Sequence, residues 1–448
     1  MGLKCLEISL KERNIVVELS WIDPFFVFEN INCKFSILLE SNYSDKRFGR
    51  YSFIFTLPKE VFVCSDKEDV IDYLHRLDKI VKSNIRKSND IFNGGLAGYL
   101  SYDFGVDLYN VKRKIQEIAI PKAFFGYYED YIIFDHFEKK VLVSSSTALL
   151  DKIRAISLNE CNNINMIPPK VEKISVNFKK EDYKKSISKI KEYIYEGDVY
   201  QVNLSQQFKF EGSFDPRFLY YHLRNKNYGA YHAFINLGDY FIISTSPELF
   251  IQKRKNKITT KPIKGTIMRT DDEKINQRHK EKLYYSEKCR AELLMIVDLE
   301  RNDLAKICIP NSIEVEKLYD IEEFSTVYHL VSTISGNLKE DVCFSDIIKA
   351  MFPGGSITGA PKLNAIKIIE ELEKCPRGIY TGSIGYVSNN FNMDFNIAIR
   401  TLIVSKNQVF YNVGGGIVWD SDEEDEYEET LHKGKALYNI LMGRDCVK

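Results

Sequence analysis

One lysine stands in a segment whose neighbours restrict the backbone on both sides. Residues Lys261–Thr266 read Lys-Pro-Ile-Lys-Gly-Thr, with Lys264 between Pro262 and Gly265. Proline locks φ and glycine permits a positive φ, so the side chain between them can be held in one direction. That direction is either toward an anionic substrate or toward water. The segment alone favours water, and the case for a functional lysine depends on the rest of the chain.

A glycine-rich loop, Pro353–Lys362, is the sharpest local signal for anion binding. It reads Pro-Gly-Gly-Ser-Ile-Thr-Gly-Ala-Pro-Lys, and we expect Pro361 at the first position of the following helix. Free N–H groups at a helix N-terminus, together with Lys362, predict an anion site. The alternative is a well-capped helix without a ligand. The order of residues matches neither the nucleotide phosphate loop nor the dinucleotide fingerprint.

Carboxylates form a second set with possible chemistry. Glu292 lies on a predicted helix whose other side is apolar, and Glu426 and Glu429 are three residues apart. Residues at this spacing share one face of a helix. Oxygen ligands from two helices, completed by water and substrate, suit Mg²⁺. The alternative is that the acidic run, Asp420–Glu429, is simply solvated.

Single basic residues complete the candidates. Arg400 falls inside a predicted strand, and a buried charge there needs a partner, either an anionic ligand or an internal carboxylate. The internal ion pair is the commoner case. Lys433 is a further cation on the closing helix. His329 alone is typical of a structural histidine.

The elements that must position these residues are mixed strands and helices. Periodicity predicts a first region, residues 1–156, then a linker, 157–180, and a main region, 181–448. The predicted strands are 51–57, 131–144 with a turn at 137–140, 199–210, 240–245, 380–387, 395–404 and 409–413. The predicted helices are 69–87, 181–196, 281–297 after a charged approach at 271–280, 361–372, and a closing helix after the acidic run.

Composition restricts the class of protein. The chain has 448 residues, of which 44% are hydrophobic, so it can bury a large core. A formal net charge of −1 gives no sign of a nucleic-acid or anionic-membrane surface. The nine cysteines are scattered, which suits reduced thiols. No signal peptide or apolar run of about 20 residues is evident, so we expect a cytoplasmic protein without a membrane partner.

Several ordered segments resemble the chorismate-utilising enzymes that include anthranilate synthase component I. They are 198–206, 246–250, 262–266, 298–304, 353–362, 377–387, Arg400 and 426–433. The resemblance spans essentially the whole chain and implies an α+β fold. In that fold antiparallel sheets pack face to face, helices lie outside, and the active site lies between the layers.

The resemblance also implies roles for individual residues, with chorismate as the substrate. Mg²⁺ held by Glu292 and Glu429, with Glu426 close by, would bind the ring carboxylate. Glu248 would be the general acid that protonates the departing C4 hydroxyl. The remaining residues expected in the substrate pocket are Arg400, Tyr380, Thr266, His329, Thr358, Gly416 and Lys433.

Two positions distinguish branches of the family. Relatives that add water carry a lysine where this chain has Gln201, which disfavours isochorismate synthesis. A lysine at position 264 resembles the branch that makes 4-amino-4-deoxychorismate for 4-aminobenzoate and folate. There the lysine attacks C2 as a neutral amine, ammonia adds at C4, and the lysine leaves. An anthranilate synthase component I remains an alternative, as does a non-catalytic chorismate-binding subunit.

Two further features follow from the same resemblance. The chain has no Gly-x-Cys-x-Gly nucleophile segment, so ammonia is expected from a separate glutamine amidotransferase subunit in a heterodimer. Leu39, Glu40 and Ser41 match a tryptophan-binding segment of anthranilate synthases, which predicts a second ligand site in the first region.

Overall fold

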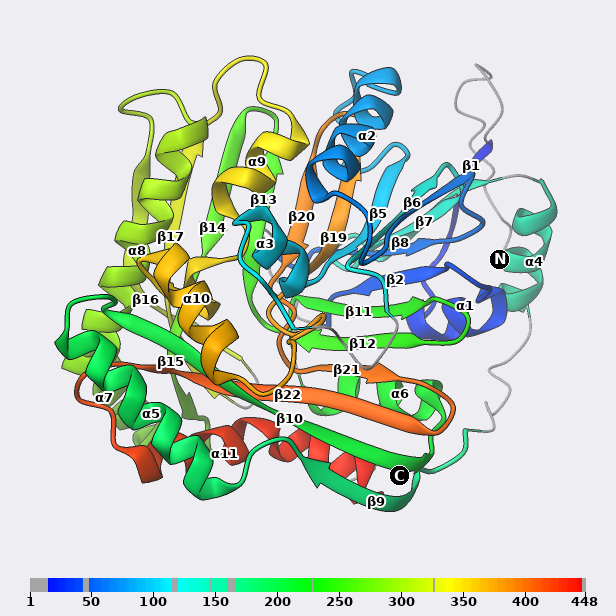
Figure 1. Ribbon diagram of the computed structural model, residues 1–448. Coiled ribbons are helices and arrows are strands. Elements are labelled where there is room, and N and C mark those ends of the chain that lie inside the picture. The colour runs from blue at the N-terminus through cyan, green and yellow to red at the C-terminus, as the bar shows by residue number, and fades with distance from the viewer. Residues whose placement is uncertain are drawn as a thin grey trace.

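The computed structural model describes residues 15–42, 48–114, 120–145, 147–158, 166–227, 229–324 and 327–444. Two large antiparallel sheets form the centre of the molecule (Figure 1). Helices cover their outer faces. This is the α+β arrangement expected from the sequence.

The first sheet combines strands from both ends of the chain. Its order is β1 (Ile15–Ser20), β8 (Lys140–Ser145), β7 (Tyr131–Asp135), β3 (Tyr51–Phe55), β2 (Ile37–Glu40), β11 (Tyr231–Asn236), β12 (Phe241–Ser246), β21 (Thr401–Val404), β22 (Gln408–Ile417), β10 (Gln201–Ser213) and β18 (Gly359–Ala360). Strand β9 (Lys170–Val176) pairs with β10. The long β10–β22 pair crosses the lower part of the molecule in Figure 1, where α11 lies against it.

The second sheet is built in the same way. Its order is β15 (Ile263–Met268), β17 (Val327–Asn337), β14 (Lys257–Lys261), β13 (Leu249–Arg254), β20 (Met393–Asn396), β19 (Ser383–Ser388), β5 (Gly95–Leu100), β6 (Ala123–Tyr128) and β4 (Glu60–Cys64), and β16 (Glu314–Glu323) pairs with β17. Both predicted regions therefore contribute to both sheets, and the predicted linker contains β9.

The helices follow from capping and amphipathic spacing. They are α1 (Pro24–Ile31), α2 (Val70–Ser83), α3 (Tyr102–Leu108), α4 (Thr147–Leu158), α5 (Lys180–Tyr195), α6 (Pro216–Lys226), α7 (Glu273–Tyr284), α8 (Glu287–Ile307), α9 (Phe344–Met351), α10 (Lys362–Leu372) and α11 (Glu423–Leu441). For example, the Asp69 carboxylate caps α2, and the predicted apolar side of this helix is buried. None of the described helices is both long and apolar enough to cross a membrane.

Apolar side chains fill the space between the layers. One core lies between the two sheets, where Phe53 of the first sheet contacts Tyr386 of the second at a ring distance of 4.9 Å. Two further cores join the sheets to their helices. Burial of this much apolar surface is the main stabilising contribution to such a fold.

The expected helix at residues 281–297 is wrong in its boundaries. The structure has two helices, α7 and α8, because the Ser286 hydroxyl accepts from Cys289 N at 3.3 Å and starts a new helix. The polar cluster at residues 298–303 is consequently not the helix end. It lies within α8, where Glu300 and Asp303 are buried.

The single strand expected at residues 395–404 is also wrong. Strand β20 belongs to the second sheet and β21 to the first, so the chain crosses between the sheets at residues 397–400. Arg400 lies in this crossing with φ of +51°, not inside a strand. The strand expected at residues 380–387 begins only at Ser383, leaving Tyr380 in the preceding turn.

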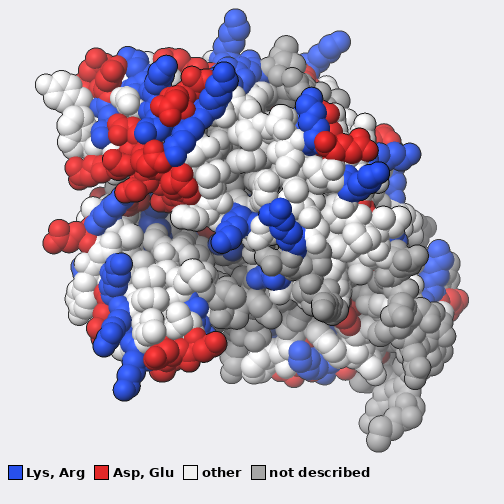
Figure 2. Space-filling model, turned by 90° about the horizontal axis from the view of Figure 1, so that it is seen from below, with Lys and Arg blue, Asp and Glu red and all other residues white. Residues whose placement is uncertain are grey.

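The face seen in Figure 2 carries acidic and basic side chains interspersed, in agreement with the small net charge. Much of this pairing is local: Lys180 and Lys184 of α5 contact Glu424 in the first turn of α11. The acidic run is thus partly neutralised by lysines of a neighbouring helix. The described cysteines all have free thiols, as expected, whereas Cys5, Cys161 and Cys446 lie outside the described residues.

Candidate active site

A bulge in β15 positions Lys264. Lys264 pairs with Leu330, yet Thr266 pairs with the adjacent His329, so Gly265 is the extra residue. Gly265 has φ of +74°, and a Cβ there would lie 2.8 Å from Leu283 Cδ1 and 2.9 Å from Cys289 Sγ. The permissive role expected of this glycine is confirmed, because only glycine accepts both the positive φ and the close approach.

Lys264 and Glu248 meet at one residue of the glycine-rich loop. The Lys264 amine donates to the carbonyl of Ser356 at 3.3 Å. The Ser356 hydroxyl donates to Glu248 Oε1 at 2.8 Å. Glu248 follows β12 and is only 5% exposed, so both groups lie in an environment that excludes most water.

Burial moves the pKa values of this pair toward each other. It lowers the pKa of Lys264, with the nearby Glu292 carboxylate acting in the opposite direction. It raises the pKa of Glu248, although the Ser356 hydroxyl and the Lys264 charge partly offset the rise. Desolvation disfavours the charged form of each group. Both shifts are in the direction that a nucleophilic amine and a proton donor require.

The three predicted metal ligands lie on neighbouring parts of this site. Glu292 of α8 and Glu429 of α11 both influence the pKa of Lys264, and Glu426 and Glu429 raise the pKa of Glu292. The side chains from α11 converge on Gly415, where a Cβ would lie 3.3 Å from Glu426 Oε2 and 3.5 Å from Glu429 Oε1. The two α11 carboxylates therefore face the same glycine of strand β22.

Lysine side chains form ion pairs with two of these carboxylates. Lys433 pairs with Glu429 at 2.6 Å and donates to Gly414 O, while Lys288 lies 3.4 Å from Glu426 Oε1. No group of three or more acidic, histidine or cysteine side chains among the described residues is close enough to hold a metal ion as it stands. The donor set is still all oxygen, the chemistry that suits Mg²⁺. The type of donor atom in these residues therefore fits Mg²⁺.

The guanidinium of Arg400 lacks an anionic partner among the described residues. Burial lowers its pKa, and no hydrogen bond or ion pair of its guanidinium occurs within the described ranges. The predicted internal carboxylate partner is therefore not found there. Its charge acts on His329, whose pKa burial and Arg400 together lower to about 3. The neutral His329 ring forms a hydrogen bond with Thr266, with 2.8 Å between His329 Nδ1 and Thr266 Oγ1.

Tyr380 completes this side of the site. It is buried, which raises its pKa, and the Glu248 carboxylate adds to the rise. Gly416 lies on β22 opposite Asn203, and a Cβ there would be 2.7 Å from Gln201 Nε2. The Gln201 amide is fully buried without a hydrogen-bond partner in the described structure. The Gln201 side chain therefore lies directly against the Gly416 backbone, where only glycine leaves room for it.

The glycine-rich loop differs from the expectation in two ways. Pro361 is the N-cap residue of α10 and not its first helical residue. The Lys362 amine is buried and donates to Asp303 at 2.6 Å and to Met351 O at 2.9 Å, so its charge is neutralised inside the protein. Lys362 is thus no anion ligand. The Thr358 hydroxyl also bonds internally, to Gly354 O at 2.8 Å.

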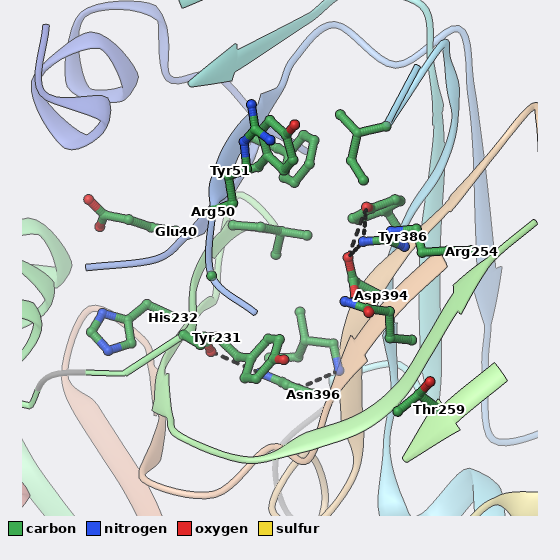
Figure 3. A pocket seen from close by; sticks show the side chains of 18 of the residues that line it. Glu40, Arg50, Tyr51, Tyr231, His232, Arg254, Thr259, Tyr386, Asp394 and Asn396 are labelled. Atoms are coloured by element: carbon green, nitrogen blue, oxygen red, sulfur yellow. Dashed lines mark hydrogen bonds and ion pairs between the residues drawn. The ribbon is translucent and has the colours of Figure 1, made fainter. Parts of the chain in front are cut away.

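Residues Leu39, Glu40 and Ser41 lie away from these groups. Leu39 and Glu40 line a cavity of about 500 Å³ between the two sheets, with Tyr51, Tyr231 and Tyr386 among its walls (Figure 3). None of the predicted catalytic residues or metal ligands lines it. This cavity is separate from Lys264.

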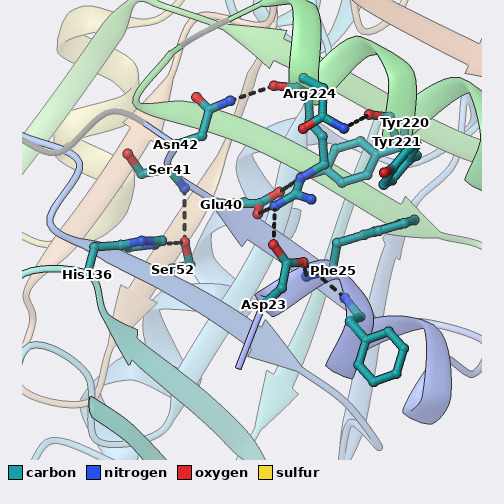
Figure 4. A network of polar contacts seen from close by, with 12 residues as sticks. Asp23, Phe25, Glu40, Ser41, Asn42, Ser52, His136, Tyr220, Tyr221 and Arg224 are labelled. Carbon is teal, nitrogen blue, oxygen red and sulfur yellow. Dashed lines mark hydrogen bonds and ion pairs between the residues drawn. The ribbon is translucent and has the colours of Figure 1, made fainter. Parts of the chain in front are cut away.

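The Glu40 side chain points away from the centre of this cavity (Figure 3). Its carboxylate accepts from Arg224 Nε at 2.9 Å and from the Tyr220 hydroxyl at 2.6 Å (Figure 4). The backbone N–H of Ser41 donates to Ser52 Oγ at 3.0 Å, and Ser52 also contacts His136. Glu40 therefore anchors β2 to α6, and Leu39 is the member of the trio that faces the cavity.

Comparisons with known proteins identify the family of this chain. Residues 35–439 match the family described as chorismate binding enzyme. The chain belongs to the chorismate-binding enzyme family. Aminodeoxychorismate synthase component 1 of Escherichia coli is 36% identical over 95% of this chain and 98% of its own length. Anthranilate synthase component 1 of Saccharolobus solfataricus is also 36% identical, over 93% of this chain and 97% of its own length.

A solved member of the chorismate-binding family shows the same fold. Anthranilate synthase component I from Streptococcus pneumoniae has a TM-score of 0.78 at 28% identity, covering 95% of this chain and 99% of that one. The family and the fold are therefore established, whereas relatives of two activities are about equally similar.

Sequence reasoning missed several residues that build this candidate site. Ser356 and Glu300 lie within segments that the sequence singled out, but their contacts are formed by residues far apart in the chain. Lys288 stands four residues before Glu292, and this spacing places both side chains on one helix face. The spacing could have indicated that Lys288 lies beside the predicted metal ligands. Arg377 opens the segment 377–387, but its buried contacts with Glu373 and the Ile357 carbonyl were not predicted.

Proposed function

We propose that this protein converts chorismate and ammonia to 4-amino-4-deoxychorismate, as an aminodeoxychorismate synthase component I. The observation that carries the proposal is the placement of Lys264. It is a half-buried lysine with a lowered pKa, held on a glycine bulge beside the buried acid Glu248. A lysine in this setting is suited to attack an electrophilic carbon.

The proposed reaction uses the two groups in sequence. The neutral amine of Lys264 forms a bond to C2 of the ring, the double bonds shift, and the C4–O bond breaks. Glu248 gives its proton to the departing hydroxyl, which leaves as water. Ammonia then forms a bond to C4, the double bonds shift back, and the C2–N bond to Lys264 breaks. The lysine is regenerated as the product forms.

Chorismate carries two carboxylates, and the site offers cations for both. Arg400, which lacks a partner in the described structure, and the buried Tyr380 are suited to the enolpyruvyl carboxylate. Thr266, His329, Thr358 and the Gly416 backbone would complete the pocket. His329 stays neutral at physiological pH because its pKa is about 3. It can therefore exchange hydrogen bonds without adding charge.

Mg²⁺ is the proposed cofactor. Glu292 and Glu429 would hold it, with Glu426 nearby, and Lys433 would have to release Glu429 to do so. Bound there, the metal would supply positive charge to the ring carboxylate and assist loss of the C4 hydroxyl.

The proposed partner is a separate glutamine amidotransferase subunit. The relatives named above are called component 1, which indicates synthases with a second component. The cavity at Leu39 would, by the same reasoning, accept a tryptophan-sized ligand. Isothermal titration of the protein with tryptophan would test this site.

Anthranilate synthesis is the second candidate because relatives with that name are equally similar. The two are separated by incubating the protein with chorismate, Mg²⁺ and ammonium. We expect a product that yields 4-aminobenzoate only after a lyase is added. Fluorescent anthranilate formed without a lyase would refute the proposal. Mass spectrometry should also detect a chorismate-derived adduct on Lys264, absent in Lys264→Ala.

A further inference from the structure

One residue of the glycine-rich loop contacts both reactive groups of the site. Ser356 accepts from the Lys264 amine through its carbonyl at 3.3 Å and donates its hydroxyl to Glu248 at 2.8 Å. Asn203 Nδ2 donates to the same carbonyl at 3.3 Å. Ser356 is only 6% exposed, so water does not compete freely for these bonds.

The turn that carries Ser356 is held from two sides. The carboxylate of Glu300 accepts from Gly355 N at 3.1 Å, and Glu300 is 2% exposed. Arg377, 1% exposed, donates to Ile357 O at 3.0 Å and to Asn203 O at 2.8 Å. A Cβ on Gly355 would lie 2.5 Å from Leu299 Cδ2, so α8 packs directly against the turn. Buried charged groups fixed in this way hold a backbone segment in one conformation.

We propose that Ser356 is a positioning residue that sets the acid and the nucleophile relative to each other, its hydroxyl holding Glu248 and its carbonyl holding Lys264. This inference rests on the proposed function for the roles of the two groups. The contacts themselves do not depend on which product is formed.

The two halves of Ser356 have separable effects. The hydroxyl stabilises the ionised form of Glu248 and so lowers its pKa, opposing burial. The charged and titratable groups that interact electrostatically with Glu248 are Lys264 of β15, Lys433 of α11, Glu300 of α8 and Tyr380, and the Ile263 N–H donates to Glu248 Oε1 at 3.5 Å. None of them is altered by removing the hydroxyl. The carbonyl that holds Lys264 is also retained in any side-chain variant.

Ser356→Ala therefore changes one limb of the pH profile. Glu248 must be protonated to act, so one limb of the kcat/KM profile reports its pKa. Loss of the hydroxyl raises that pKa, and we expect this limb to move up by about half to one pH unit. The limb that reports deprotonation of Lys264 stays in place. Ser356→Thr keeps a hydroxyl and restores the limb that reports Glu248.

A measurement without turnover accompanies the kinetics. The infrared band of the protonated Glu248 carboxyl, assigned by its loss in Glu248→Gln, is titrated with pH in the substrate-free wild type, Ser356→Ala and Ser356→Thr. The midpoint should rise in Ser356→Ala alone. Thermal melting of each variant shows that the fold is retained.

The possible outcomes distinguish the positioning role of Ser356 from the identity of the proposed product. Equal midpoints in wild type and Ser356→Ala overturn the role of Ser356, as does a shift that Ser356→Thr does not restore. If the protein makes anthranilate, the proposed product is wrong, and the infrared titration still decides the positioning role.

Discussion

Replacement of Glu248 by glutamine tests the proposed acid without disturbing its surroundings. Glutamine keeps the volume and an oxygen that can accept from Ser356 at the observed 2.8 Å contact. It cannot release a proton. Because Glu248 is only 5% exposed, bulk water is a poor substitute donor at this place. The variant should therefore fold normally and lose the chemical step.

The size of the loss follows from the contribution of a positioned acid. General acid catalysis contributes about 10²- to 10⁴-fold, which corresponds to ~3 to 5 kcal/mol at ~1.4 kcal/mol per tenfold. We expect kcat to fall by this factor with little change in KM for chorismate. The limb of the pH profile that reports Glu248 should disappear in the variant.

The assay follows chorismate consumption with Mg²⁺ and ammonium, with products separated by chromatography. Glu340→Gln is the matched control, since it makes the same change of charge at an exposed turn residue. A Glu248→Gln variant that retains activity within about threefold of wild type, far below the expected loss, would refute the assignment.

Three other predictions address the substrate, the loop and the metal. Arg400→Met should raise KM for chorismate about 10- to 100-fold, because charge-assisted hydrogen bonds contribute about 1.5–3 kcal/mol; an unchanged KM would contradict the carboxylate role. Burial and Asp303 raise the pKa of Glu300 to about 7, above its unfolded value of about 4.3, so the stability it contributes is complete below about pH 4.3 and is lost as pH rises through 7. Urea unfolding should show wild type losing ~1–3 kcal/mol relative to Glu300→Gln between pH 5 and pH 8, whereas parallel curves would contradict this. Chelation by EDTA should abolish turnover and added Mg²⁺ restore it, with Glu429→Gln requiring at least about tenfold more Mg²⁺; activity that survives chelation would exclude the metal role.

Local sequence was enough for many elements of the fold. The apolar spacing of α2, the Asp69 cap and the apolar strands β7 and β8 are each determined within about one helical turn or strand. The backbone around Lys264 is also determined locally, because Pro262 and Gly265 each restrict or permit φ at their own position. The positive φ of Gly265 was therefore open to prediction.

The tertiary structure decided what the charged residues contact. Lys362 looked free for an anion, but Asp303, 59 positions earlier, neutralises it; Arg400 looked paired within a strand, but lies in a crossing between the sheets without a partner in the described chain. Such contacts depend on which distant segments pack together, and no local spacing encodes them. The sequence by itself thus determined the reactive residue types and their local frames. Only the assembled sheets determined that Ser356 joins Lys264 to Glu248. Lys264 comes from strand β15, Glu248 from the link between β12 and β13, and Ser356 from the glycine-rich loop, and folding brings the three together.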